Sequence, residues 1–397
     1  MHKSEICNNQ SAINFAVTDA GTHQAYIVAS VKHLKNPDVA AESLYSRIAE
    51  MLKEREMEIV HERIFGSLGK ASLILKTRSE TMLSQGISPD NPVTYIQGNP
   101  PWGEGLAGII IRAVSSSGQG RDVWTITDNS VPCGKGWQLN GIKYLILQNI
   151  QGEADSADSI QTRTVRAQRM FERANRILNQ QGASYKNVIR TWIYLSDILE
   201  WYDEFNGVRN STYRDFGIMP GQNSHLFLPA STGIQGTVLS GAPVAMDILA
   251  VGPGEDSHQM IKRMSSTRQI EAYQYYSAFS RGLIIHEPEI SIIQVSGTAA
   301  IDEEGQSIYP GDIRGQIDYT FDAVDTLVRQ EDASLEDVCA ATVFVKRPED
   351  IHIFQEMAGS RGLEDFPCVC VVADICRKEL LFEIDAEVVI RKGSKGD

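Results

Sequence analysis

Two stretches of the chain, 150 residues apart, share one pattern of apolar and polar positions. Residues 179–195 (NQQGASYKNVIRTWIYL) and 329–345 (RQEDASLEDVCAATVFV) both run from a polar turn into a continuous apolar segment. A short apolar run bounded by turn residues is typical of a buried strand. The match therefore indicates an internal repeat.

Each copy of this pattern has a helix before it and an apolar strand after it. Upstream, apolar residues recur at helical spacing over 171–178 and 317–328. Downstream lie the apolar segments 244–251 and 380–390, which predict strands. The order of these elements predicts an α+β layer, with helices on one face of a mixed sheet.

A weaker first copy precedes the other two. A helical pattern over 44–54 leads into an apolar segment at 57–68, and a further strand is expected at 108–114. Each unit is thus expected to contain strands, a helix, a strand, a second shorter helix and a closing strand. Three such units in one chain suggest a pseudo-trimer, and two full units with an N-terminal extension are the alternative.

Segments rich in Gly, Ser and Pro mark the expected boundaries between units. They lie at 115–121 (SSSGQGR) and 252–259 (GPGEDSHQ). We therefore expect a degenerate first unit at 1–120, a second unit at 121–255 and a C-terminal unit at 256–397.

Composition and charge narrow the classes of function. Among 397 residues, 37 are Lys or Arg and 51 are Asp or Glu, which gives a net charge of −14. A nucleic-acid partner or an anionic membrane would need a basic surface, so neither is expected. A small anionic substrate stays possible, because a site needs only a few well-placed cations.

Targeting and metal signals are weak in the sequence. No apolar run reaches the length of about 18 residues that a membrane helix needs, and the N-terminus lacks a signal-peptide pattern. We expect a cytoplasmic protein with reduced thiols. No metal site is expected, because the His residues are scattered and the six cysteines form no CxxC pair: Cys7, Cys133, Cys339, Cys368, Cys370 and Cys376.

The C-terminal unit carries motifs of a known family. The segments VSGTAAIDEEGQSIYPGD (295–312), ASLEDV (333–338) and DFPCVCVVADI (365–375) resemble the RidA/YjgF family. The resemblance implies a chorismate-mutase-like fold in trimeric assemblies with sites between neighbours. The deaminating members have an Arg where this chain has Val369, so the substrate carboxylate would lose a bidentate partner. Imine deamination is therefore disfavoured.

A second resemblance covers roughly residues 93–397. The chain is similar to the chorismatases, which are built on RidA-like units and cleave the enolpyruvyl ether of chorismate. The matching segments are RTWIYL (190–195), YRDF (213–216), LPASTGI (228–234), FSR (279–281), SGTA (296–299), PGD (310–312) and ADICRKELLFEID (373–385). Tyr309 replaces the usual His before PGD, and the stretch at 273–277, which shapes the substrate pocket in the family, lacks the family's Pro and Gly. Tyr273, in that stretch, is a candidate substrate contact.

The chemistry of ether cleavage points to a carboxylic acid. Protonation of the enolpyruvyl methylene gives an oxocarbenium ion, and a carboxyl group with a raised pKa in a dry pocket is suited to this step. Glu383 is the candidate, and the resemblance implies the role of proton donor. Strand alternation places Glu383, Asp385 and Leu381 on one face, and repulsion between the two carboxylates raises one pKa.

Chorismate is a dicarboxylate, so the site needs cations. The resemblance implies a carboxylate-binding role for Arg361, which lies 22 residues before Glu383. Arg281 and Arg377 are further candidates, Arg190 is a weaker one, and Thr298 is a candidate contact beside them. The aromatic residues Trp192, Tyr194, Trp201, Tyr202 and Phe205 are expected to belong to the core.

Cys376 and Gly297 occupy positions that separate chorismatase subtypes. Cys and Gly there resemble the subtype that forms 3-hydroxybenzoate, whereas Ala at both resembles hydrolases that release a dihydroxycyclohexadiene carboxylate. A plain core cysteine and a strand glycine that permits close backbone approach are the structural alternatives.

The sequence thus predicts a cofactor-independent chorismatase-like lyase or hydrolase that forms pyruvate and 3-hydroxybenzoate. The alternative is a non-catalytic RidA-like module that binds a metabolite or a protein, and an imine deaminase ranks third. The site is expected between the third unit and a neighbouring one. The chain is expected to act as a monomeric pseudo-trimer or as a homodimer.

Overall fold

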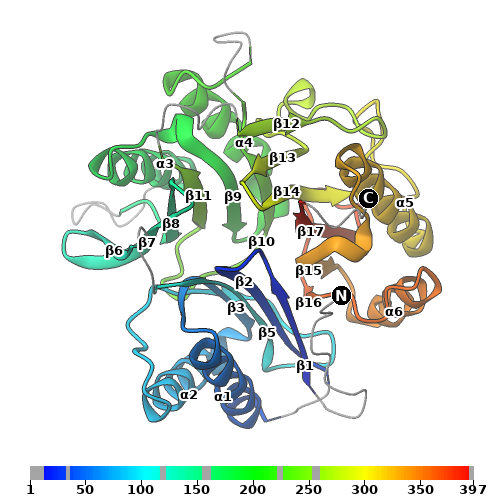
Figure 1. Ribbon diagram of the computed structural model, residues 1–397. Coiled ribbons are helices and arrows are strands. Elements are labelled where there is room, and N and C mark those ends of the chain that lie inside the picture. The colour runs from blue at the N-terminus through cyan, green and yellow to red at the C-terminus, as the bar shows by residue number, and fades with distance from the viewer. Residues whose placement is uncertain are drawn as a thin grey trace.

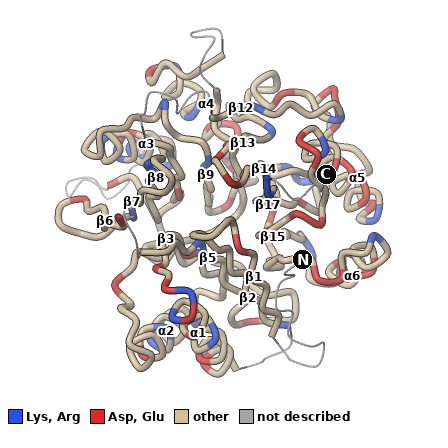
Figure 2. The backbone as a smooth tube through the Cα atoms, viewed as in Figure 1, with Lys and Arg blue, Asp and Glu red and all other residues tan. Residues whose placement is uncertain are grey.

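The computed structural model describes residues 13–32, 36–116, 122–153, 162–220, 227–252 and 260–392. Most of the predicted linker at 115–121, nearly all of that at 252–259, and Cys7 lie outside these ranges. The described chain forms three mixed sheets with two helices on the outer side of each (Figure 1). Acidic and basic residues are interspersed along the outer helices (Figure 2).

The first sheet has the strand order β1-β2-β5-β3-β4. Its strands are β1 (Ile13–Asp19), β2 (Gln24–Val31), β3 (Met57–Gly66), β4 (Thr94–Gln97) and β5 (Leu106–Ser115), and its helices are α1 (Pro37–Glu54) and α2 (Ala71–Ser84). The first helix begins well before the predicted 44, since Pro37 occupies its first turn, where the missing N–H costs nothing.

The second sheet has the order β10-β9-β11-β8-β7-β6. Its strands are β6 (Val123–Asp128), β7 (Val131–Leu139), β8 (Ile142–Ile150), β9 (Val188–Leu195), β10 (Ala230–Gln235) and β11 (Val244–Val251), with helices α3 (Arg163–Gln180) and α4 (Ile198–Asp215). Strand β11 has the bounds that its apolar pattern predicts.

The third sheet has the order β12-β13-β14-β17-β15-β16. Its strands are β12 (Ile261–Met264), β13 (Gly282–His286), β14 (Ile290–Ala299), β15 (Val338–Val345), β16 (Cys368–Val372) and β17 (Phe382–Arg391), with helices α5 (Ile313–Val328) and α6 (Ile351–Ser360). Leu381 precedes β17 and packs with Phe382 and Ile384 in one hydrophobic cluster, so the predicted common face of Leu381 and Glu383 is wrong.

The repeated Ala-Ser pair has a structural reason in both later units. Ser184 and Ser334 each cap a short 3-10 turn with a reciprocal capping box, whose other members are Asn187 and Asp337. Each turn delivers the chain directly into a central strand, β9 or β15. The α+β class and the tandem units are confirmed.

The three sheets face a common centre, where one hydrophobic cluster draws on all three units, including Phe65, Trp192 and Phe344 (Figure 1). Such an arrangement creates junctions between neighbouring sheets. Among the described residues, no helix is long and apolar enough to cross a membrane.

Candidate active site

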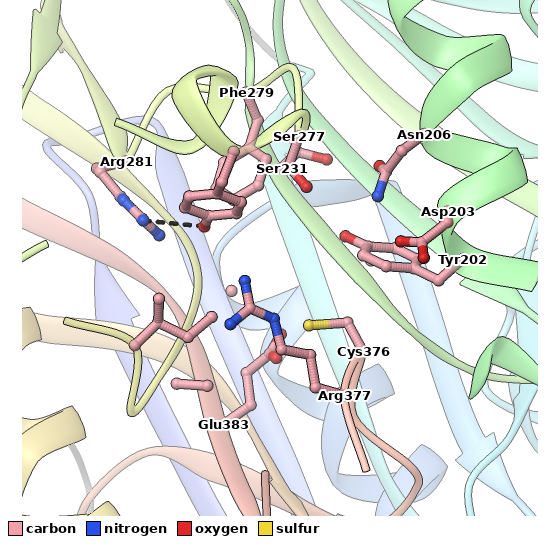
Figure 3. A pocket seen from close by; sticks show the side chains of 15 residues that line it. Tyr202, Asp203, Asn206, Ser231, Ser277, Phe279, Arg281, Cys376, Arg377 and Glu383 are labelled. Atoms are coloured by element: carbon pink, nitrogen blue, oxygen red, sulfur yellow. Dashed lines mark hydrogen bonds between the residues drawn. The ribbon is translucent and has the colours of Figure 1, made fainter. Parts of the chain in front are cut away.

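A cavity lies where the second and third units meet (Figure 3). Helix α4 and strand β10 form one wall, and strands β14 and β17 with the segments 275–281 and 376–377 form the other. The lining residues are Tyr202, Asp203, Asn206, Ser231, Gly233, Tyr275, Ser277, Phe279, Arg281, Gly297, Ala299, Ile301, Cys376, Arg377 and Glu383.

Hydrogen bonds between the units fix the two walls against each other. The backbone N–H of Ser231 donates to Oγ of Ser296 at 2.8 Å, and that hydroxyl donates to the carbonyl of Ser280 at 2.6 Å. The N–H of Ser280 in turn donates to the carbonyl of Pro229 at 3.0 Å. Ser296 thus joins the second and third units at this junction.

Glu383 lies on β17 with 4% of its surface exposed, facing the cavity. Burial, together with the nearby Asp385, raises the pKa of its carboxyl to about 8, against the opposing effect of Arg190 and Arg281. The carboxyl is therefore largely protonated at neutral pH. A protonated carboxyl beside a cavity can donate a proton to a bound molecule.

Gly297 leaves the space that the Glu383 side chain occupies. A Cβ on Gly297 would overlap Oε1 of Glu383 and would lie 3.1 Å from its Cδ and 3.3 Å from Cγ2 of Thr232. The register of the β14–β17 pair also shifts between Val295 and Thr298, as at a β-bulge. This glycine permits close approach of a side chain, rather than of backbone as the alternative held.

Asp385 lies one strand repeat behind Glu383 and belongs to a buried network between the units. Its Oδ2 accepts hydrogen bonds from Thr232 at 2.8 Å and from Nη2 of Arg190 at 3.1 Å. Its Oδ1 accepts from the backbone of Thr342 at 3.1 Å. Arg190 is fully buried, and burial lowers its pKa to about 10, so it remains a cation at neutral pH. Asp385 is thereby paired with a buried cation next to the acid.

The junction between the first two units repeats this network without the acid. Asp247 accepts from Oγ1 of Thr94 at 2.6 Å and contacts Nε2 of His61 at 2.9 Å. Two residues before Asp247 stands Ala245, whereas Glu383 stands two residues before Asp385. The acid distinguishes the junction that holds the cavity.

Two arginines face the cavity, and they differ in how many of their nitrogens are already hydrogen-bonded. Arg281 donates from Nε to the carbonyl of Ile270 at 3.0 Å and from Nη2 to the Tyr275 hydroxyl at 2.9 Å, so two of its nitrogens are engaged. Arg377 donates from Nη1 to the carbonyl of Gly305 at 2.9 Å and to Ser307 at 3.2 Å. Its guanidinium carbon lies 5.4 Å from the centroid of the Tyr275 ring. Arg377 is the better placed of the two to bind an anion.

Cys376 lies beside the acid. Burial raises the pKa of its thiol to about 12, and the neighbouring Glu383 contributes to this rise. The thiol is therefore neutral at pH 7, and it acts as a small polarisable wall rather than as a thiolate nucleophile.

Besides Arg190, which binds Asp385, three predicted site residues lie outside this cavity. Arg361 caps the end of α6 and pairs with Asp318 and Asp322 on α5, because the helix end points away from the junction. Thr298 is buried and donates to the carbonyl of Ser296 at 2.9 Å, since strand alternation turns it away from the face that Gly297 and Ala299 present. Tyr273 packs against the hydrophobic cluster of the second unit, and Tyr275 lines the cavity in its place.

Comparison with known proteins gives consistent matches. The family described as endoribonuclease L-PSP matches residues 271–390. A 3-hydroxybenzoate synthase from Streptomyces hygroscopicus is 24% identical over 55% of this chain and 67% of its own length. A chorismatase from the same organism is 25% identical over 52% of this chain and 63% of its own length, so the match spans about two thirds of each relative. A crystal structure of a chorismatase shares the fold, with a TM-score of 0.60, 18% identity, and coverage of 83% of this chain and 92% of that one.

The chain resembles the chorismatases in sequence and shares the fold of one of them. Its RidA-like fold agrees with the resemblance that the sequence motifs carry. Val369, which stands where the deaminating relatives are expected to have Arg, is fully buried in the central cluster. Within the described ranges, no group of three or more His, Cys, Asp or Glu side chains could hold a metal ion.

The family resemblance did not identify the α4 wall of the cavity. Tyr202 packs against the hydrophobic cluster of the second unit, as expected, and it also lines the cavity. Burial raises the pKa of its hydroxyl well above the usual range. Asp203 and Asn206 lie beside it on α4. Polar residues on the helix were the available signal, but the packing of the two units decides which of them face a cavity.

Proposed function

We propose that the chain cleaves the enolpyruvyl ether of chorismate, releasing pyruvate and 3-hydroxybenzoate. The observation that carries this proposal is Glu383, a buried carboxyl with a pKa raised to about 8 that faces a cavity lined by two arginines. The names of the two Streptomyces hygroscopicus relatives support the choice of substrate and product.

Glu383 performs the first step in this proposal. Its proton passes to the methylene carbon of the enolpyruvyl group, and the ether oxygen stabilises the oxocarbenium ion that forms. A low-dielectric site keeps the acid protonated until a substrate arrives, and a pKa near the working pH suits proton transfer. The nearby Asp385 raises the pKa of Glu383 and so favours its protonated form in the free enzyme.

The arginines account for the binding of an anion. Arg377 and Arg281 give the cavity positive charge in a chain whose net charge is −14. Charge-assisted hydrogen bonds to a carboxylate are stronger than neutral ones. The carboxylates of the substrate therefore bind on the Arg377 side, which brings the enolpyruvyl methylene toward Glu383.

The reaction balances without a co-reactant when the product is aromatic. One proton is added to the methylene carbon, which becomes the methyl group of pyruvate. The neighbouring ring hydroxyl then adds to the oxocarbenium carbon and releases its proton, and loss of the ring proton at the ether-bearing carbon breaks the bond between the ring and that hydroxyl oxygen as the ring becomes aromatic. Collapse of the resulting hemiketal leaves the hydroxyl oxygen as the ketone of pyruvate and the ether oxygen, with a proton, on the ring as the phenol. The carboxyl of Glu383 is thereby regenerated, and no cofactor is required. Trapping of the oxocarbenium ion by water would give the dihydroxycyclohexadiene carboxylate instead.

Cys376 and Gly297 support the aromatic product. Both line the cavity beside Glu383, as the 3-hydroxybenzoate-forming subtype would require. The open, acid-bearing cavity also favours an enzyme over the non-catalytic binding module. We retain the division into units at 1–120, 121–255 and 256–397 and the pseudo-trimer as part of the proposal.

Incubation of the purified protein with chorismate tests the proposal. Pyruvate is followed with a coupled assay and the aromatic product by chromatography. A Glu383→Gln variant serves as the matched control, because it keeps the volume and removes the acidic proton. Equal amounts of pyruvate and 3-hydroxybenzoate, lost in the variant, are the expected result, and absence of turnover in the unmodified protein would refute it.

A further inference from the structure

The wall of the cavity opposite the arginines comes from helix α4 of the second unit. Figure 3 shows Tyr202, Asp203 and Asn206 on this wall, across from Arg281 and Arg377. Asn206 has only 6% of its surface exposed. Burial of an amide costs free energy unless its polar atoms are hydrogen-bonded. Each polar atom of the Asn206 amide is therefore expected to have a partner, in the protein or in a bound molecule.

Arg209, one helical turn further along α4, fixes the orientation of the Asn206 amide. Its Nη2 donates to Oδ1 of Asn206 at 2.6 Å. Because a guanidinium has donors and no acceptor, the oxygen of the amide must face Arg209. The hydrogen-bond network thus settles the choice between the two amide orientations. The group that Asn206 presents on its other side is the amide nitrogen, a donor.

Arg209 is itself held in place by packing. It is 1% exposed, and its guanidinium carbon lies 5.6 Å from the ring centroids of both Phe205 and Phe279. Phe279 also lines the cavity. A guanidinium confined by two aromatic rings has little freedom to release the amide. The orientation of Asn206 is therefore built in before any substrate binds.

We propose that Asn206, held by Arg209, donates a hydrogen bond from Nδ2 to an acceptor oxygen at the end of the substrate remote from Arg377. This inference rests on the proposed function. A substrate with oxygen atoms at both ends is then held between α4 and the arginines, with its enolpyruvyl methylene over Glu383. Asn206 is a substrate-binding residue in this arrangement, and Arg209 is a positioning residue that acts through it.

An Asn206→Asp variant separates this role from a structural one. The variant has the same shape and keeps an oxygen facing Arg209, where the contact becomes an ion pair. Toward the cavity it presents an acceptor in place of a donor. We expect KM for chorismate to rise at least about tenfold, since a hydrogen bond is lost and two acceptors are opposed. The kcat should stay within about twofold and the melting temperature should not fall.

Two further variants complete the experiment. Asn179→Asp adds the same charge at an exposed position on α3 and should leave KM unchanged. Arg209→Met removes the group that orients the amide, so it should raise KM, but should add little in an Asn206→Ala background. Such non-additivity is the signature of two residues that act as one unit.

The outcomes distinguish this inference from the proposed function. If the unmodified protein does not turn over chorismate, the proposed function fails and the inference fails with it. If the unmodified protein is active and Asn206→Asp keeps its KM, the inference alone is overturned. An equal rise of KM in Asn179→Asp would also overturn it, because the effect would then reflect net charge.

Discussion

Gly297 and Glu383 fit together so closely that a side chain on the first would displace the second. A Cβ at position 297 would overlap Oε1 of Glu383 and would come within 3.1 Å of Cδ. The neighbouring Cγ2 of Thr232, at 3.3 Å from the same point, limits relaxation on the other side. The glycine therefore sets the position of the acid as well as the room in the cavity.

Gly297→Ala is expected to reduce turnover of chorismate by at least about a hundredfold in this chain, although the hydrolase subtype carries Ala at this position. Here the Glu383 carboxyl occupies the space of the added Cβ, so the acid must leave its place, and a small misplacement is costly. The effect should appear mainly in kcat, with the fold retained as judged by circular dichroism. Steady-state kinetics on the purified variant provide the measurement.

Gly359→Ala is the matched control for this variant. Gly359 lies in helix α6, where an added Cβ would meet only Cγ of Glu364 at an ordinary 3.8 Å. Alanine in a helix is more stable than glycine by roughly 0.5–1 kcal/mol. The control should keep full activity and melt slightly higher, and wild-type turnover in Gly297→Ala would contradict the proposed fit.

Asp385→Asn is expected to shift the pH dependence of kcat/KM. Glu383 acts in its protonated form, so activity should fall as pH rises through about 8 in the unmodified enzyme. Loss of the carboxylate at 385 removes a cause of the raised pKa and leaves the charge of Arg190 unopposed. The falling limb should therefore move to lower pH in the variant.

A pH–rate profile of both proteins checks this shift. A Thr232→Val variant tests the alternative that the network acts through packing, because it removes the 2.8 Å hydrogen bond to Asp385 but keeps the carboxylate. The falling limb of the pH–rate profile of Thr232→Val should stay closer to that of the unmodified enzyme. An unmoved limb in Asp385→Asn would show that burial alone sets the pKa of Glu383.

Glu383→Gln is expected to change how stability depends on pH. The folded-state pKa of about 8 lies above the value near 4.3 for an unfolded chain. Between these values the folded state holds a proton that the unfolded state has released, so stability falls as pH rises through this window. The variant lacks this contribution and should lose less stability from pH 5 to pH 8.

Denaturant unfolding at several pH values measures the difference between the two proteins. The comparison matters because burial lowers the pKa of His61, which makes stability rise with pH over part of the same range. Subtraction of the variant from the unmodified protein removes this common contribution. Parallel curves for the two proteins would contradict a raised pKa at Glu383.

The pattern of apolar and polar residues was sufficient to predict those elements whose structure depends on residues close together in the sequence. The apolar run at 244–251 predicted β11 with its observed bounds, and the shared Ala-Ser pair marked the turn before each central strand. Alternation also placed Glu383 and Asp385 on one face of β17. These features depend on neighbours in sequence and on a strand period of two.

The parts that sequence reasoning missed depend on how two units dock. Asn206 lies on a helix of the second unit and Glu383 on a strand of the third, and no spacing relates them. Arg361 shows the opposite error: its distance in sequence from Glu383 matched the family pattern, but α6 ends on the outer side of the sheet, where Asp318 and Asp322 bind it. Motif spacing carries no information on which way such a helix end points.

Cys376→Ala is expected to change the product more than the rate. The thiol lies beside the acid and is neutral, so its removal leaves Glu383 able to protonate the substrate. The resemblance to the 3-hydroxybenzoate-forming subtype predicts a shift from the aromatic product toward the dihydroxycyclohexadiene carboxylate. Chromatography of the products at equal pyruvate release measures the ratio, and an unchanged ratio would assign Cys376 to the wall alone.

Arg377→Met and Arg361→Met together test which arginine binds the substrate. The geometry of the cavity favours Arg377, whereas the spacing of the family motif favours Arg361. Arg377 lines the cavity with part of its guanidinium free of the bonds to Gly305 and Ser307. A hydrogen bond to a charged group contributes about 1.5–3 kcal/mol, so its loss should raise KM by roughly 10- to 150-fold. Methionine keeps the length of the side chain and removes the charge.

Arg361→Met should leave KM and kcat close to their unmodified values. Its ion pairs with Asp318 and Asp322 are partly exposed, and such pairs contribute about 1 kcal/mol or less, so only a small loss of thermal stability is expected. Steady-state kinetics and thermal melts on both variants decide the matter. A large rise of KM in Arg361→Met with none in Arg377→Met would reverse the assignment, and it would place the substrate's carboxylate near the end of α6.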